Sequence, residues 1–378
     1  MITFFCSSFY FIGGLTPVKL AFAMLLVYTG YLIKKGYEKI HLANTSVLLA
    51  FTFFLIFSFS SLIYAKDKTL AIKNLNSLIY AYFLFVALII LIKYSTVNYK
   101  RIQYGLIVAG LVNCIFSFLQ VLTGAWFMPG TPDRSTSTEG MTRANGLYDD
   151  PNYLGLFLVC LWPFLFQQEI RYRYLLLLIF VSTIFLTFSR ATAIIFFIQV
   201  LIFVYLNTRN KLFFLLKSSA VIISLSGILL VFNPLGLADR FLSVGSVIQG
   251  DESSYDNSTA ERLDVFFAGI KMFFDYPFFG VGYGNFQRFS SSYMDFFPRE
   301  VLAHNTYITI LAELGILGFL LFVFYLYSIG NVISKSKDSV LIVSFIGYLM
   351  SIYFLVAQAF PTAMIFLTLY VCSKRHNN

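Results

Sequence analysis

Three side chains at the edges of apolar segments could carry out chemistry. Arg190 lies in "LTFSRATAII", Arg262 lies in "STAERLDVFF", and His304 opens "HNTYITILAELGILGF". A guanidinium group binds phosphate through a planar fork of donors, and a neutral imidazole accepts a proton near physiological pH. These residue types therefore predict a site that binds a phosphate group and takes a proton from a hydroxyl.

Each of the three also has a structural interpretation, which the sequence leaves open. Arg190 fits an arginine at the end of a membrane helix, with its side chain reaching the lipid headgroups. Arg262 lies beside Glu261 and near Asp264, so a surface ion pair is an equally simple interpretation. A lone histidine at a membrane interface, such as His304, is more often structural than catalytic.

Amides and glycines accompany these residues. Asn305 follows His304, and Glu313 lies further along the same segment, where both could orient groups or bind sugar hydroxyls. The stretch "FFGVGYGNF" holds Gly282 and Asn285. Its spacing is not G-x-G-x-x-G and no βαβ pattern surrounds it, which excludes a dinucleotide site. The glycines instead permit a tight turn or a close approach to a ligand, and we include Gly282, Asn285 and Asn305 among the candidate substrate ligands.

A pair of carboxylates precedes one apolar run, in "NGLYDDPNYLG". Asp149 and Asp150 could hold a metal ion or act as acid and base, with Asn152 as a further ligand. However, "DPN" before an apolar run is also an ordinary helix start, with Asp150 as the cap. We favour the helix start, and we keep Asn152 as a candidate substrate ligand.

The elements that must position these residues are membrane helices. Of the 378 residues, 58% are hydrophobic and 12% are charged, whereas soluble proteins have about 25% charged residues. Apolar runs long enough to cross a bilayer recur along the whole chain, which predicts an all-α, polytopic transmembrane helix bundle of roughly ten to twelve spans in a single domain, 1–378. The candidate spans are 2–15, 17–33, 44–64, 72–92, 102–122, 151–166, 174–188, 191–206, 212–232, 307–329, 340–355 and 359–371.

Lysine and arginine gather in alternate short turns, which places the N-terminus in the cytoplasm. The net charge of +9 is then a topology signal, since the basic residues form no single stripe for nucleic acid. Two long polar segments, 126–150 and 233–303, fall on the outer side. The cysteines, Cys6, Cys114, Cys160 and Cys372, show no spacing typical of a zinc site or a disulfide framework.

The second outer loop, 233–303, contains a helix pattern. Ser258 and Glu261 fit a capping box, apolar residues follow at helical spacing, and Pro277 ends the run. The predicted amphipathic helix is too short and too charged to span. We expect it to lie on the outer membrane surface or to cover the bundle from above.

Four segments together resemble one family. "NGLYDDPNYLGLFL", "TFSRATAIIFF", "ERLDVFFAGIKMFFDYPFFGVGYGNF" and "HNTYITILAELGILGFLLF", in this order, resemble the O-antigen ligase and polysaccharide polymerase family of bacterial inner membranes. The resemblance covers 145–323. It implies an integral-membrane glycosyltransferase of the GT-C type that acts on glycans attached to undecaprenyl diphosphate, without a metal or other cofactor. It further implies that Arg190 and Arg262 bind the diphosphate and that His304 is the base for the acceptor hydroxyl.

The resemblance leaves the acceptor open. We expect a polymerase that transfers a glycan to the sugar of another lipid-linked repeat unit at the periplasmic face. A ligase that transfers the finished glycan to lipid A core or another terminal acceptor is the close alternative. A lipid-glycan flippase is a third, although such transporters usually carry their polar groups at the midplane. A chain-length regulator and a flippase are candidate protein partners, and nucleic acid is not expected as a partner.

Overall fold

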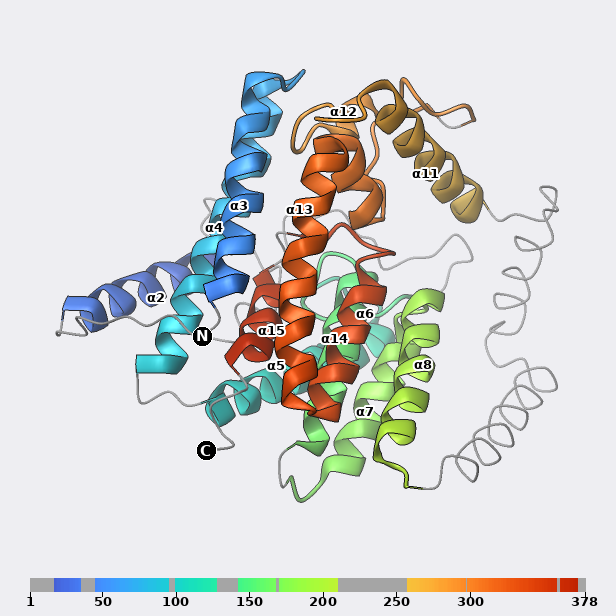
Figure 1. The fold of residues 1–378 in the computed structure, drawn as a ribbon. Helices are drawn as coiled ribbons and strands as arrows, with labels where there is room; N and C mark the ends of the chain where they lie inside the picture. The colour runs from blue at the N-terminus through green and yellow to red at the C-terminus, as the bar shows by residue number, and fades with distance from the viewer. Residues whose placement is uncertain are drawn as a thin grey trace.

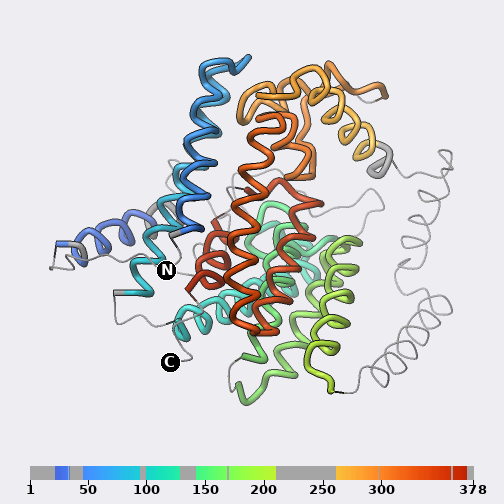
Figure 2. Tube along the Cα trace, in the orientation of Figure 1, coloured from blue at the N-terminus to red at the C-terminus, as the bar shows by residue number. Residues whose placement is uncertain are grey.

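The computed structural model describes residues 17–34, 45–94, 99–127, 142–167, 170–209, 257–296, 298–358 and 361–372. These residues form a helix bundle with a helical loop over one end, as Figures 1 and 2 show. Within these ranges the elements are helices and connecting segments, without a β-strand. The predicted all-α membrane bundle is confirmed, while the predicted spans 2–15 and 212–232 lie outside the described residues.

The helices follow the predicted apolar runs closely, with ends that differ by a few residues. Their bounds are α2 (Pro17–Lys34), α3 (Thr45–Ser60), η2 (Ser61–Ile63), α4 (Lys68–Tyr94), α5 (Tyr99–Thr123), α6 (Pro151–Leu161), η3 (Trp162–Phe166), α7 (Arg173–Leu186), α8 (Arg190–Asn207), α11 (Asn257–Asp275), α12 (Phe286–Ser290), α13 (Thr306–Ser336), α14 (Ser339–Ser351) and α15 (Pro361–Cys372).

Several helices are long enough to cross a bilayer. Within the described residues, 5 candidate spans meet the length and hydropathy expected of a crossing helix: Ser46–Ile63, Lys68–Lys93, Tyr99–Thr123, Arg190–Asn207 and Thr306–Ser336. Large apolar side chains on the outside of the bundle are exposed, among them Val27 at 75%, Ile56 at 59% and Leu178 at 62%. Lipid tails are the environment that such a surface requires.

Helix α15 differs from a lipid-facing span. Its 12 residues extend about 18 Å, which is less than the hydrocarbon thickness of about 30 Å. Every residue from Thr362 to Val371 is buried, and the helix packs against α4 and α13. A helix that is apolar on all sides belongs inside a bundle, so α15 forms part of the core.

A polar network joins α6, α8 and α14 in the middle of the bundle. The Gln199 side chain accepts a hydrogen bond from Trp162 Nε1 at 3.0 Å. Its Nε2 donates to the carbonyls of Val159 and Val343, at 3.0 and 2.8 Å. Because an amide inside a bilayer must find internal partners, this network fixes how the three helices pack.

The first outer loop, predicted at 126–150, is partly buried in the bundle. In the described part of this loop Ala144, Asn145 and Tyr148 are fully buried. The side-chain oxygen of Asn113 on α5 accepts the Leu147 N–H at 3.0 Å, and Gln120 accepts the Asn145 N–H at 3.0 Å. Polar side chains on α5 therefore accept hydrogen bonds from backbone N–H groups of a loop that enters the bundle.

Helix α11 covers the end of the bundle at which α13 begins, at the top of Figure 1. Its buried Val265, Ala268 and Met272 belong to one apolar cluster with Phe286 and Ile308. The predicted amphipathic helix is thus present and packs on the bundle from above. It is already formed at Asn257, so Ser258 lies within the first turn and not ahead of it as a cap.

Candidate functional site

The start of helix α8 is set by a sharp turn. Phe188 has a left-handed backbone with φ of 49°, and Ser189 is the N-cap whose side chain accepts the Thr192 N–H. Arg190 is therefore the first helical residue, and it is half-buried. Serine is one of the preferred N-cap residues because its short side chain reaches the free amides of the first turn.

The start of helix α6 confirms the helix-start interpretation of "DPN". Asp150 is the N-cap, Pro151 follows at the first position, and Asp150 Oδ1 accepts the Asn152 N–H at 2.7 Å. The same oxygen also accepts from Asn152 Nδ2 at 2.8 Å. Within the described residues, His, Cys, Asp and Glu side chains form no group of three or more that could hold a metal ion.

A small cavity, here called the arginine cavity, brings two of the predicted residues together. Arg262 lines it from α11, and Asn152 lines it from the start of α6. Arg190 does not line it, although its two sequence neighbours, Ser189 and Ala191, do. The cavity has a volume of about 10 Å³. It is lined by Asn152, Leu156, Ser189, Ala191, Thr192, Ile195, Arg262, Ser351, Phe354 and Leu355.

The two carboxylates nearest to Arg262 in the sequence hold neighbouring segments to α11. Glu261 forms an ion pair with Arg299 and raises the pKa of that arginine through a hydrogen bond and its charge. The two oxygens of Asp264 accept the backbone N–H groups of Asp295 and Phe296, at 2.9 and 3.0 Å. These carboxylates hold Asp295, Phe296 and Arg299 to α11. Arg262 is exposed and lines the arginine cavity.

His304 lies beside the arginine cavity and does not line it. Asn305 is the N-cap of α13, and its side-chain oxygen accepts the Ile308 N–H at 3.1 Å. Thr306 then donates from its N–H to the Ile352 carbonyl at 2.8 Å and from its hydroxyl to the Leu355 carbonyl at 2.6 Å. Since Leu355 lines the arginine cavity, these bonds tie Thr306, two residues after His304, to the cavity wall.

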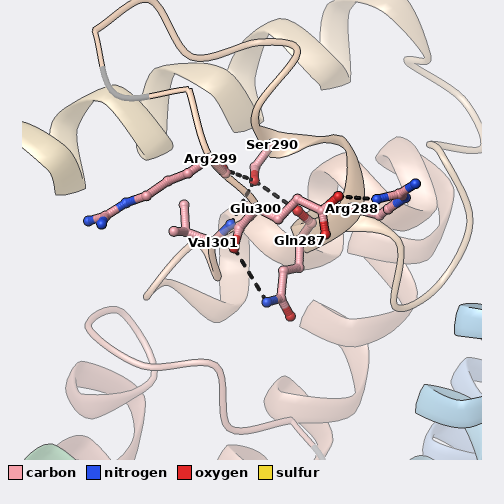
Figure 3. Close-up of polar contacts among 6 residues, drawn as sticks. All are labelled: Gln287, Arg288, Ser290, Arg299, Glu300 and Val301. Atoms are coloured by element: carbon pink, nitrogen blue, oxygen red, sulfur yellow. Dashed lines mark hydrogen bonds and ion pairs between the residues drawn. The ribbon is translucent and has the colours of Figure 1, made fainter. Parts of the chain in front are cut away.

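Residues 299–301, which precede His304 in the chain, are bonded to residues of α12, as Figure 3 shows. Ser290 Oγ accepts the Val301 N–H at 3.0 Å and donates to the Arg299 carbonyl at 3.0 Å. Arg288 forms an ion pair with Glu300. His304 itself has a left-handed backbone with φ of 47°, a conformation that persists only when the surroundings impose it.

The glycine stretch, residues 278–286, joins the segment between α11 and α12 to α13 and to the residues before α4. The Gly282 N–H donates to the Glu313 carbonyl at 2.8 Å, and a Cβ at Gly282 would lie 2.6 Å from the Cα of Ala65. Asn285 is fully buried, and its side chain accepts from the N–H and donates to the carbonyl of Asp67, at 2.7 and 3.1 Å. A substrate role for Gly282, Asn285 and Asn305 stays a prediction.

Glu313 anchors the same stretch from α13. Its two carboxylate oxygens accept the N–H groups of Gly284 and Phe286, at 2.7 and 3.0 Å. Tyr283, which directly precedes Gly284, is buried, and burial together with the Glu313 charge raises the pKa of this tyrosine, so its hydroxyl stays protonated.

A larger cavity of about 250 Å³, here called the glycine-loop cavity, lies beside these contacts. It is lined by Asn74, Ser77, Tyr283, Gly284, Phe286, Gln287, Leu302, Ala303, Thr309, Glu313, Val356, Gln358 and Pro361. None of the residues proposed as catalytic lines it, although Ala303 directly precedes His304.

Arg143 is a basic residue near the site that sequence reasoning missed. Its Nε donates to the Thr187 carbonyl at 3.0 Å, three residues before Arg190, and the neighbouring Ala144 N–H donates to the Leu186 carbonyl at 2.8 Å. The only sequence signal was its place in the segment that precedes "DDPN". Its approach to α8 depends on the buried course of the first outer loop.

The arrangement can bind an anion at one end of the bundle. Arg262, Arg190 and the N-terminus of α8 each contribute positive potential there. The negative charge of the Asp150 carboxylate, at the start of α6, cancels part of this positive potential. The combination suits a phosphate group whose charge is shared among several donors.

Comparison with known proteins gives one family. Residues 175–323 match the family described as O-antigen ligase. This range runs from α7 into α13 and contains Arg190, Arg262 and His304, so the resemblance drawn from the sequence is confirmed. The search of curated proteins finds no match for the chain.

Proposed function

From the match of residues 175–323 to the O-antigen ligase family, we propose that the chain is a polysaccharide polymerase of the bacterial inner membrane. It transfers a glycan from undecaprenyl diphosphate to a sugar hydroxyl of another lipid-linked repeat unit, on the periplasmic side. The observation that carries the proposal is the arginine cavity, where Arg262, Asn152 and the start of α8 meet at one end of the bundle. The family match supports glycan transfer, and the donor, the acceptor and the side of the membrane belong to the proposal.

The arginines act on the leaving group. The reaction breaks the bond between the anomeric carbon and a phosphate oxygen, and the electron pair leaves with the lipid diphosphate. Because negative charge grows on that oxygen, guanidinium groups held beside it stabilise the transition state more than the ground state. In this proposal Arg190 and Arg262 bind the diphosphate, and Asn152, which also lines the arginine cavity, binds the donor.

His304 acts on the acceptor. As the acceptor hydroxyl oxygen bonds to the anomeric carbon, its proton passes to the imidazole, a step that general bases accelerate by about 10²–10⁴-fold. The hydrogen bonds of Asn305 and Thr306 fix the backbone on which His304 stands. Helix α11 above the site keeps out water, which would otherwise compete as an acceptor.

A ligase is the second candidate, because the matched family is described as an O-antigen ligase. It would use the same donor and the same three residues, with lipid A core or another terminal acceptor in place of the repeat unit. A deletion strain separates the two. Single repeat units accumulate on the carrier if the protein is a polymerase, whereas long chains remain on the carrier if it is a ligase.

The test of transfer itself uses purified protein in detergent with glycan linked to undecaprenyl diphosphate. We expect longer glycans and free undecaprenyl diphosphate as products. Detergent removes the two sides of the membrane, so a flippase would leave the substrate unchanged. Unchanged substrate in this assay would contradict the proposed function.

A further inference from the structure

One segment of the chain lines both cavities. Between α14 and α15, Phe354 and Leu355 face the arginine cavity, and Val356 and Gln358 face the glycine-loop cavity. The segment is fixed to the start of α13, because the Thr306 hydroxyl donates to the Leu355 carbonyl at 2.6 Å and accepts the Ala357 N–H at 3.0 Å. The segment 354–358, which is bonded to the residue two positions after His304, therefore borders both cavities.

The glycine-loop cavity has a neutral, hydrogen-bonding lining. Gln358 Oε1 is buried and accepts no hydrogen bond within the described residues, while the Gln358 amide forms a side-chain hydrogen bond with Tyr283. Asn74 and Ser77 on α4 and Tyr283 in the glycine stretch add further amide and hydroxyl groups. Amide and hydroxyl groups both donate and accept hydrogen bonds, so this lining suits a ligand that carries several hydroxyl groups.

The charge of the lining disfavours a diphosphate. Glu313 contributes a buried carboxylate to this cavity, and no arginine or lysine lines it. A carboxylate repels a phosphate but accepts a hydrogen bond from a sugar hydroxyl through its remaining lone pairs. The volume of about 250 Å³ lies below the roughly 300–1,000 Å³ of pockets for drug-sized ligands, so the cavity suits about one sugar ring.

We propose that the glycine-loop cavity is the acceptor subsite, which binds a terminal sugar of the acceptor glycan through Gln358, Asn74 and Ser77. This inference rests on the proposed function. It places the donor diphosphate on the arginine side of the segment 354–358 and the acceptor sugar on the other side. Ala303 lines this cavity and is followed directly by His304, which puts the proposed base next to the acceptor hydroxyl.

The experiment measures the binding of two probes to the full-length protein in detergent. One probe is undecaprenyl diphosphate, and the other is the repeat-unit oligosaccharide freed from its lipid by mild acid. Gln358→Met keeps the length of the side chain and removes its hydrogen bonds, and Ser77→Trp fills the cavity from an exposed position on α4. Asn331→Ala, an exposed amide near the far end of α13, is the control.

We expect Gln358→Met to weaken oligosaccharide binding about three- to tenfold, as expected for one lost hydrogen bond. Ser77→Trp should abolish oligosaccharide binding, while both variants and the control bind undecaprenyl diphosphate like the unmodified protein. Arg262→Ala should give the reverse pattern. Oligosaccharide binding unchanged in both cavity variants, or an equal loss for both probes, would overturn the subsite. Failure of the unmodified protein to transfer glycan would instead overturn the proposed function.

Discussion

At the scale of single residues, His304 combines a candidate chemical role with an unfavourable backbone. Its φ of 47° lies in the left-handed region, which costs a residue other than glycine about 1–3 kcal/mol. Asn305 and Thr306 impose this conformation through their bonds to α13 and to the segment after α14. A strained backbone at this position suggests that the histidine side chain has a functional role, here the proposed role as the base for the acceptor hydroxyl.

Replacing His304 by glycine separates the two roles. Glycine adopts a positive φ without strain. The free energy of unfolding of His304→Gly should therefore exceed that of His304→Ala by about 1 kcal/mol, and its unfolding temperature should be higher. Both variants should lose glycan transfer. Thermal unfolding and transfer rates in the same detergent measure the two effects, and a glycine variant that still transfers glycan would show that only the backbone matters.

At the scale of elements, the sequence predicts the helices well and their tertiary contacts poorly. Apolar runs and caps such as Asp150 are local features, so helix ends were predicted to within a few residues. The cap at Ser258 was misplaced because α11 is already formed at Asn257. The buried course of the first outer loop could not be predicted, since the backbone N–H groups of Leu147 and Asn145 donate to Asn113 and Gln120, which lie 34 and 25 residues away.

The Gln199 network predicts how tightly α8 and α14 must pack. A Cβ at Gly347 on α14 would lie 2.1 Å from Gln199 Nε2, an atom already bonded to two carbonyls. Gly347→Ala should therefore destabilise the bundle by about 1–3 kcal/mol. The control is Gly30→Ala on α2, where nothing lies within 4 Å of the new Cβ.

Thermal unfolding compares the two variants. Because alanine favours a helix over glycine by about 0.5–1 kcal/mol, Gly30→Ala should be neutral or slightly stabilising. Equal unfolding temperatures for Gly347→Ala and the unmodified protein would mean that α8 and α14 are not held together by Gln199 in this way.

At the scale of the whole molecule, the fold gathers the candidate residues at one end of the bundle. The helices α6, α8 and α13 begin at this end and α11 covers it (Figure 1). The sequence predicted this common end from the alternation of spans and loops. It could not predict that Arg262 and Asn152 share a cavity, or that Arg143 approaches α8, because both depend on how distant loops dock.

The predicted orientation places this end outside the cytoplasm. In a variant without the native cysteines, Lys271→Cys on α11 should react in intact cells with a maleimide that does not cross membranes. Lys335→Cys at the other end of α13 should react only after the cells are permeabilised, because the lysine and arginine bias places that end inside. Labelling in the opposite order would invert the topology and remove the periplasmic site.

The most direct test of the account compares two positive charges on one helix. Arg262 lines the arginine cavity, whereas Lys271 on the same helix faces outward and forms an ion pair with Asp295. With glycan linked to undecaprenyl diphosphate and purified protein in detergent, Arg262→Ala should lower kcat by about 10²–10³-fold, the effect of losing one donor to a developing anion. Lys271→Ala should transfer glycan at the normal rate. Near-normal turnover by a folded Arg262→Ala protein would contradict the claim that this cavity stabilises the departing diphosphate.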